Sequence, residues 1–135
     1  MVATSRDQSK HLLELGLDPN TADMYYTGHR SIHNPKEIEY TQEPRVRTKF
    51  VSFDRLEVFF PAWSLQALLD IMPEKLTDGR AHYYIESDLK SEIYYCAYAN
   101  IVPSRKGYTF KANILDAAFE MVKWLLKMEI IKKSK

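Results

Sequence analysis

The closing segment of this sequence, Ile114 to Ile131, places the strongest constraint on the fold, because apolar residues lie on nearly every side of the helix it predicts. A surface helix needs an apolar arc of only about 100°. One apolar stripe here consists of Leu115, Ala118, Val122 and Leu125, and the side chains that widen it beyond such an arc are Phe119, Trp124, Leu126 and Met128. We expect a helix from Asn113 to about Met128 that the rest of the molecule must cover, and a second subunit would supply part of that cover.

Composition and length indicate one globular domain over residues 1–135. The chain is 45% apolar and 27% charged, close to the globular averages of about 45–50% and about 25%. A chain of this size buries roughly two-thirds of its unfolded surface, so a core can form without disulfides or metals. Charges interrupt the closing segment at Asp116, Glu120, Lys123, Lys127 and Glu129, so we expect no membrane span there.

Charge and cysteine content restrict the possible functions. Nineteen Lys and Arg balance eighteen Asp and Glu, and the resulting net charge of +1 gives no large field to attract polyanions. Cys96 is the only cysteine, which excludes an internal disulfide and a two-cysteine metal motif. The first ten residues have no apolar signal region. Together these features predict a cytoplasmic protein.

Two short helices are predicted near the N-terminus. Ser5 and Gln8 have the spacing of a capping box, and Gly16 is placed to end the helix in a left-handed conformation. Asp18 and Pro19 predict a second helix of about a turn and a half, with the aspartate as its cap and the proline in its first turn.

The next part of the sequence predicts a loop and then a strand. Residues 25–44 are polar and rich in turn-forming residues, so we expect a loop with one short strand at 38–40. From Arg45 to Phe53 the side chains alternate, which predicts a strand, and residues 56–60 should continue it or pair with it. One face of this strand would carry Val46, Thr48 and Phe50, and the other Arg45, Arg47 and Lys49.

A short apolar helix is predicted between two prolines, at residues 64–72. Ser64 is its cap, and Trp63 and Leu68 have the spacing of a hydrophobic staple. Isolated helices shorter than about 12 residues are marginal in water, so this helix must dock on another element.

Three more extended segments follow, and they complete the predicted fold. They lie at 81–86, 92–99 and 107–111, with a hairpin turn at 103–107. We expect an α+β fold with a mainly antiparallel sheet of about four to five strands, packed by the long C-terminal helix and by short N-terminal and central helices.

Three blocks of sequence, Leu12 to Tyr26, Pro61 to Pro73 and Ile114 to Leu126, carry a resemblance to a known family. The chain resembles short uncharacterised proteins encoded in phage-like and mobile elements of gut Bacteroidales. The resemblance covers about 40 residues spread over the chain and implies a shared single-domain fold. It implies no activity and no site residues. The family's last helix usually closes on a Gly-Tyr pair, where this chain has Met128 to Ile130, and residues 28–55 differ widely between members.

The sequence offers few residues for catalysis. His29 and His33 have the i, i+4 spacing of a metal pair on a helix, but Asn34-Pro35 breaks the segment, and we interpret both histidines as loop residues. Ser64 lacks the glycines of a nucleophile elbow. The four glycines lie too far apart for a phosphate-binding loop. We therefore expect no metal, no cofactor and no enzymatic activity.

Two binding functions remain. The first is a non-catalytic accessory protein of a mobile element or phage that acts by protein–protein contact or self-association, through an aromatic surface of Phe59, Phe60, Trp63, Phe119 and Trp124. The alternative is a nucleic-acid-binding protein that contacts phosphates through Arg45, Arg47, Lys49 and Arg55. A charged outer strand face that prevents edge-to-edge pairing would explain the same basic residues.

Overall fold

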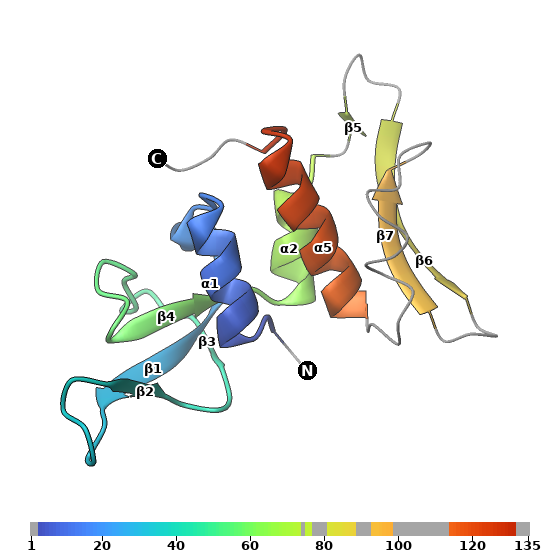
Figure 1. The fold of residues 1–135 in the computed structure, drawn as a ribbon. Helices are drawn as coiled ribbons and strands as arrows, with labels where there is room; N and C mark the ends of the chain where they lie inside the picture. The colour runs from blue at the N-terminus through green and yellow to red at the C-terminus, as the bar shows by residue number, and fades with distance from the viewer. Residues whose placement is uncertain (1–2, 74, 77–80, 89–92, 99–113, 132–135) are drawn as a thin grey trace.

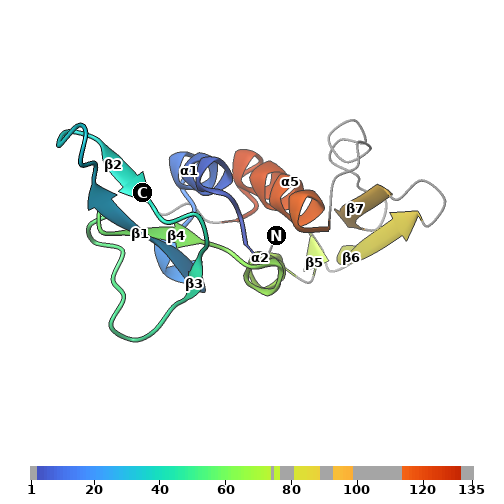
Figure 2. The ribbon, with the colours of Figure 1, turned by 90° about the horizontal axis from the view of Figure 1, so that it is seen from below.

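The structure is a computed structural model that describes residues 3–73, 75–76, 81–88, 93–98 and 114–131. In these residues, three α-helices lie between two antiparallel sheets (Figures 1 and 2). One sheet has four strands and the other has three. The α+β class, the four-stranded antiparallel sheet and the C-terminal helix are confirmed. The second, smaller sheet was not distinguished from the first in the sequence.

The first helix, α1 (Arg6–Glu14), begins as its capping box predicts. The hydroxyl of Ser5 accepts a hydrogen bond from the amide of Gln8 at 3.1 Å, and the Gln8 side chain accepts one from the amide of Ser5 at 3.0 Å. Gly16 follows the helix with a φ of 97°, a left-handed conformation that glycine adopts without a steric penalty. Both ends of α1 are therefore determined by local sequence.

The second helix is a single 3-10 turn, η1 (Pro19–Thr21), which is shorter than expected. Asp18 caps it by accepting a hydrogen bond from the amide of Asn20 at 2.9 Å. The turn ends early because the first strand, β1 (Met24–Arg30), begins only three residues later.

Residues 24–30, most of which the sequence analysis assigned to a loop, form the central strand of the larger sheet. β1 pairs antiparallel with β2 (Ile38–Tyr40), β3 (Arg45–Val46) and β4 (Phe59–Ala62). Only Tyr26 is buried in β1, so the strand carries no run of alternating apolar residues by which it could be recognised.

Gly28 lies inside β1 for a packing reason. A Cβ atom at this position would lie 2.2 Å from the carbonyl oxygen of Glu57 and 2.8 Å from Cε1 of Tyr40. The amide of Gly28 donates to the carbonyl of Val58 at 2.8 Å, which holds the two backbones together. The glycine is thus a site of close backbone approach and not a strand breaker.

The strand expected from Arg45 to Phe53 is only two residues long, and this corrects the sequence expectation. After β3 the chain leaves the sheet, and Val51 and Phe53 enter the core from a loop. The partner strand expected at 56–60 begins further along the sequence, as β4. It follows a turn in which the amide of Val58 donates to the carbonyl of Arg55 at 3.0 Å.

The main core lies between the helices. α5 (Ile114–Lys127) packs against α2 (Leu65–Ile71), and α1 packs against β4 (Figure 1). Ser64 caps α2 as predicted, by accepting a hydrogen bond from the amide of Ala67 at 3.2 Å. The buried residues of α5 are Leu115, Ala117, Ala118, Phe119, Met121, Val122, Leu125 and Leu126. Most of the apolar perimeter of the last helix is therefore covered within one chain, while Met128 remains 59% exposed.

The end of α5 carries a glutamate where glycine is usual. Glu129 has a φ of 58°, and its amide donates to the carbonyl of Leu126 at 3.1 Å. The next amide, of Ile130, donates to the carbonyl of Leu125 at 2.9 Å. These two bonds form a Schellman motif, whose left-handed position strongly favours glycine.

The smaller sheet has the order β5-β6-β7. β6 (Ala81–Asp88) and β7 (Ile93–Tyr98) confirm two of the extended segments, and β5 (Lys75–Leu76) pairs with the start of β6. α5 packs against β7. The extended segment at 107–111 and the turn at 103–107 lie outside the described residues. None of the helices in the described ranges combines the length and apolar character that a bilayer span requires.

Candidate functional site

Two of the five aromatic residues expected at an interaction surface are core residues. Trp63 has no exposed area and Phe119 has 6%. The indole N–H of Trp63 donates to the hydroxyl of Thr21 at 2.9 Å, and the Phe119 ring meets the imidazole of His11 edge-on at a centroid distance of 6.2 Å. In the folded chain these two side chains stabilise the core and offer no surface to a partner.

The other three aromatic residues are half-buried and have partners in the same chain. Phe59 meets Tyr25 edge-on at 5.4 Å, and Phe60 meets Tyr40 in the same way at 5.3 Å. Trp124 packs against the main core. These five residues therefore form no single exposed patch, and the expected aromatic surface is not supported.

The basic residues also differ from the expected row on one strand face. Arg45 and Lys49 are exposed, while the guanidinium of Arg55 donates to the carboxylate of Glu57 at 2.9 Å. Arg47 is half-buried and turned inward. One of its terminal nitrogens donates to the carbonyl oxygens of Asn20 and Ala22.

Arg47 fastens the loop after β3 to η1. Its second terminal nitrogen donates to the side chain of Asn20 at 3.2 Å and to the carbonyl of Val51 at 3.4 Å. The guanidinium carbon also lies 4.5 Å from the ring centroid of Phe53, a cation–π distance. A guanidinium engaged in this way is a structural clamp and has little capacity left for a phosphate.

The loop held by Arg47 presents an aromatic ring to solvent. The amide of Val51 donates to the carbonyl of Thr48 at 3.1 Å and closes a four-residue turn, with Lys49 and Phe50 at its central positions. Phe50 is 82% exposed, and Val46 on β3 is 71% exposed. We call residues Thr48 to Val51 the Phe50 turn. Arg47 anchors the N-terminal side of the turn, and Val51 and Phe53, which belong to the main core, anchor its C-terminal side.

The sequence analysis placed Phe50 in a strand, on the face opposite Arg45, Arg47 and Lys49, whereas it lies in a turn beyond β3. The signal for an exposed Phe50 lies in its neighbours. Val51 and Phe53 are spaced so that both can enter the core only if the residue before them turns outward. An alternating pattern that starts at Val46 does not reveal this, because the pattern is offset by one residue before Val51. An offset of one residue exchanges the two faces of a strand.

A second feature is a pocket of about 490 Å³ beside η1 and α2. Its apolar lining consists of Leu17, Ala67, Ile71 and Ile131, and its polar lining of Asp18, Thr21, Asp23 and Asp70. We call it the acidic pocket. No ion pair joins any of its three carboxylates to a basic group within the described residues.

The carboxylates of the acidic pocket are held by hydrogen bonds instead. Asp23 accepts hydrogen bonds from the amide of Ser64, at 2.9 Å, and from the Ser64 hydroxyl. Asp70 accepts one from the side-chain amide of Gln66 at 2.7 Å. The lining therefore combines an apolar floor with negative charge that no ion pair among the described residues compensates, which favours a ligand that is apolar and basic.

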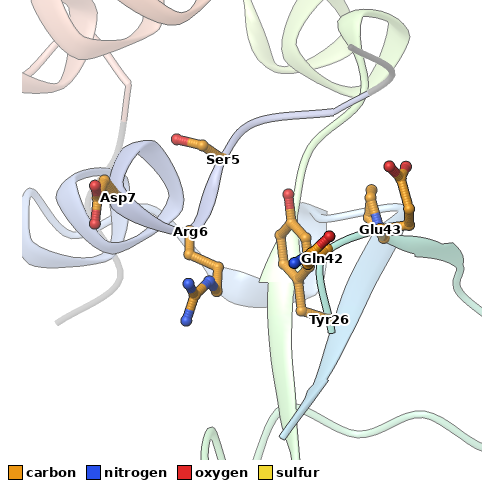
Figure 3. A pocket seen from close by; sticks show the side chains of 7 residues that line it. Ser5, Arg6, Asp7, Tyr26, Gln42 and Glu43 are labelled. Atoms are coloured by element: carbon orange, nitrogen blue, oxygen red, sulfur yellow. The ribbon is translucent and has the colours of Figure 1, made fainter. Parts of the chain in front are cut away.

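A third feature is a pocket of about 420 Å³ at the start of α1, shown in Figure 3. It arises from a bulge. Between the pairs Gly28–Tyr40 and Met24–Val46, β1 advances four residues while its partner segment advances six. Gln42, Glu43 and Pro44 belong to this longer segment and line the pocket, and Pro44 is tolerated here because a bulge needs no ladder amide.

The polar groups of this bulge pocket carry mixed charges. Arg6 lies on one side and Glu43 on the other, while Asp7 points away from Tyr26 (Figure 3). Burial is the main cause that raises the pKa of Tyr26, with Arg6 opposing the shift and Glu43 adding to it. The Tyr26 hydroxyl donates to the carbonyl of Thr4 at 2.8 Å, so its proton is already used within the chain.

The histidines do not form a metal centre in the described part of the chain. His29 lies on β1 with its ring nitrogen 3.5 Å from the Glu39 carboxylate across the β1–β2 pair, and His33 lies in the loop beyond. No group of three or more potential metal ligands occurs among the described residues.

Comparison of the chain with protein-family models, with curated proteins and with solved structures finds no match. The functional argument therefore rests on the geometry of the Phe50 turn and the two pockets.

Proposed function

We propose that this chain is a non-catalytic protein-interaction module and that the Phe50 turn is its contact surface. The observation that carries the proposal is the combination of 82% exposure at Phe50 with firm anchoring on both sides of the turn. The resemblance to proteins of phage-like and mobile elements is the basis for proposing an accessory role in such an element.

Because Phe50 is exposed, the isolated chain does not gain the free energy of burying its ring. Full burial of a phenylalanine side chain stabilises by about 1.5–3 kcal/mol, and most of this ring remains in water. Contact hot spots are typically aromatic or arginine side chains that enter a pocket on the partner. Phe50 has the required character and lies on a turn whose backbone is already ordered, so binding costs little conformational entropy.

The charge around the turn indicates the chemistry of the partner. Arg45 and Lys49 are exposed on the same segment, and the ammonium of Lys49 lies 5.3 Å from the centroid of the Phe50 ring. A protein surface with an apolar hollow and a negative rim would complement this combination. Such complementarity raises the association rate and selects the partner more than it adds affinity.

The same three residues are compatible with the alternative, a nucleic-acid contact by stacking and phosphate binding. Arg47, however, is engaged with backbone oxygens, and Arg55 is paired with Glu57, so two of the four expected phosphate contacts are occupied. With a net charge of only +1, the remaining two cations carry little of the electrostatic term that dominates such binding. The protein contact is the better-supported function.

A photo-crosslinking residue at position 50 tests the proposal in cells that carry the gene. We expect adducts that contain protein at position 50. The matched control is position 32, because Ile32 is 92% exposed in the loop between β1 and β2 and is equally accessible to a bystander. Equal protein adducts at both positions would contradict the proposal.

A gel shift with single- and double-stranded nucleic acid tests the alternative. We expect no retention at moderate salt for the wild-type chain. Retention that weakens steeply with salt and disappears in an R45E/K49E variant would favour the nucleic-acid function instead.

A further inference from the structure

The structure contains both parts of a self-complementary contact. We propose that the partner of the Phe50 turn is a second copy of this chain, with Phe50 of each copy inserted into the acidic pocket of the other. This inference rests on the proposed function of the Phe50 turn and names its partner.

The acidic pocket matches the Phe50 turn in chemistry and has room for its ring. Its floor of Leu17, Ala67 and Ile71 is apolar, and its volume of about 490 Å³ is large enough to admit a phenylalanine side chain. Asp70 on its lining is exposed and has no ion-pair partner among the described residues. A phenylalanine ring flanked by a lysine ammonium supplies an apolar group for the floor and a positive charge for Asp70.

The position of the two parts favours reciprocal insertion. Arg47 joins the Phe50 turn to Asn20 and Ala22 of the η1 segment, and the same segment supplies Asp18 and Thr21 to the pocket. In Figure 2 the loop between β3 and β4 lies on the same side of the molecule as α2, while α1 and α5 lie on the other.

Because the loop that carries the Phe50 turn lies on the same side as α2, which supplies Ala67, Asp70 and Ile71 to the pocket, a two-fold axis can pass between turn and pocket, and both contacts then form in a closed dimer. If they faced opposite sides, the same contact would give an open chain of subunits. We therefore expect the assembly to end at two copies.

Sedimentation velocity of the full chain over about 1–100 µM should show reversible monomer–dimer exchange. Phe50→Ala should raise the dimer dissociation constant at least about tenfold, because it removes both inserted rings. The matched control is Ile32→Ala, which removes a similarly exposed apolar side chain and should leave the constant unchanged.

A charge swap identifies the pocket. Lys49→Glu and Asp70→Lys should each weaken the dimer, and the K49E/D70K double variant should restore it, because each contact pairs position 49 of one copy with position 70 of the other. Both residues are exposed, so the variants should fold normally. Lys132 and Lys133 follow Ile131 in the sequence and carry the same sign as Lys49. A K132E/K133E variant with unchanged dimerisation confirms that Lys49 is the relevant cation.

Three results would overturn the inference. The first is a wild-type chain that remains monomeric over the whole concentration range. The second is assembly that continues beyond two copies. The third is a K49E/D70K double variant that dimerises no more tightly than either single variant. If the chain is monomeric but position 50 still crosslinks to another protein, the second copy is excluded as partner while the proposed function stands. If position 50 crosslinks to no protein, both fail.

Discussion

The guanidinium carbon of Arg47 lies 4.5 Å from the centroid of the Phe53 ring, and this pair connects a surface loop to the core. Phe53 is 7% exposed, so its ring is a fixed platform. The guanidinium group spreads its remaining donors over backbone oxygens of η1 and of Val51. The Arg47 side chain, together with the buried side chains of Val51 and Phe53, holds the Phe50 turn on which the proposed function depends.

Replacing Arg47 should therefore affect stability. Arg47→Ala is expected to lower the free energy of unfolding by about 1.5–3 kcal/mol, because it leaves backbone carbonyls without donors and removes the cation–π contact. Arg47→Lys keeps the charge but not the planar fork of donors, and should lose much of the same stability. Urea denaturation measures both.

The matched control for Arg47 is Arg45→Ala. Arg45 is exposed, and an exposed substitution of this kind changes stability by less than about 0.5 kcal/mol. Equal stability of the two alanine variants would show that Arg47 is no clamp.

Gly28→Ala should destabilise the larger sheet. The added Cβ would lie 2.2 Å from the carbonyl oxygen of Glu57, which belongs to the backbone and cannot rotate away. We expect a loss of about 1–3 kcal/mol, the usual cost of forcing extra volume into a packed site. A denaturation midpoint equal to that of the wild type would contradict the close approach of β1 to residue 57.

Tyr26→Phe should remove the hydrogen bond to the carbonyl of Thr4 and nothing else of comparable size. A buried carbonyl left without a donor costs about 1–3 kcal/mol. Thermal or urea denaturation measures the loss. Tyr26 also lines the bulge pocket, so a change in ligand binding measured with this variant should be compared with its change in stability.

The same tyrosine predicts a loss of stability at alkaline pH. Burial raises the pKa of Tyr26 above its ordinary value of 10.0, and burial does the same for Tyr40. Above pH 10 the unfolded chain releases these protons before the folded chain does, so unfolding becomes more favourable as the pH rises toward the folded pKa values. Below pH 10 the contribution of these two tyrosines to the free energy of unfolding is fully present.

Unfolding free energies of the wild type and of Tyr26→Phe, measured from pH 8 to above pH 10, test this linkage. The variant should lose less stability over the alkaline part of the range. Parallel curves for the two proteins would contradict a raised pKa at Tyr26.

Glu129→Gly should be more stable than Glu129→Ala. Glu129 occupies a left-handed position with a φ of 58°, which costs a residue with a Cβ about 1 kcal/mol relative to glycine. The difference in unfolding free energy between the two variants should be about 0.5–1 kcal/mol. Glu129→Ala is the control, because it removes the same side chain but keeps the backbone penalty. Stabilisation by alanine equal to that by glycine would show that the side chain, and not the backbone, is responsible.

Local sequence was sufficient wherever the signal is local. The capping box of Ser5 and Gln8, the left-handed Gly16 and the cap at Ser64 all involve groups within a few residues of one another. The closing helix was also predicted within about a residue at each end, because its apolar pattern is long. Local hydrogen bonds and helical periodicity depend only on residues that are close together in the sequence, so they can be predicted without knowledge of the fold.

What only the tertiary structure decided was the assignment of faces and partners. β1 carries one buried residue, so its strand forms because β2, β3 and β4 pair with it and not because of its own pattern. Alternation placed Phe50 on one strand face with Val46 and Thr48, yet Val51 and Phe53 enter the core and Phe50 is exposed to solvent. Trp63 and Phe119 face inward because helices from distant parts of the chain cover them. Burial depends on what packs against a residue from elsewhere in the chain, and that information is not local.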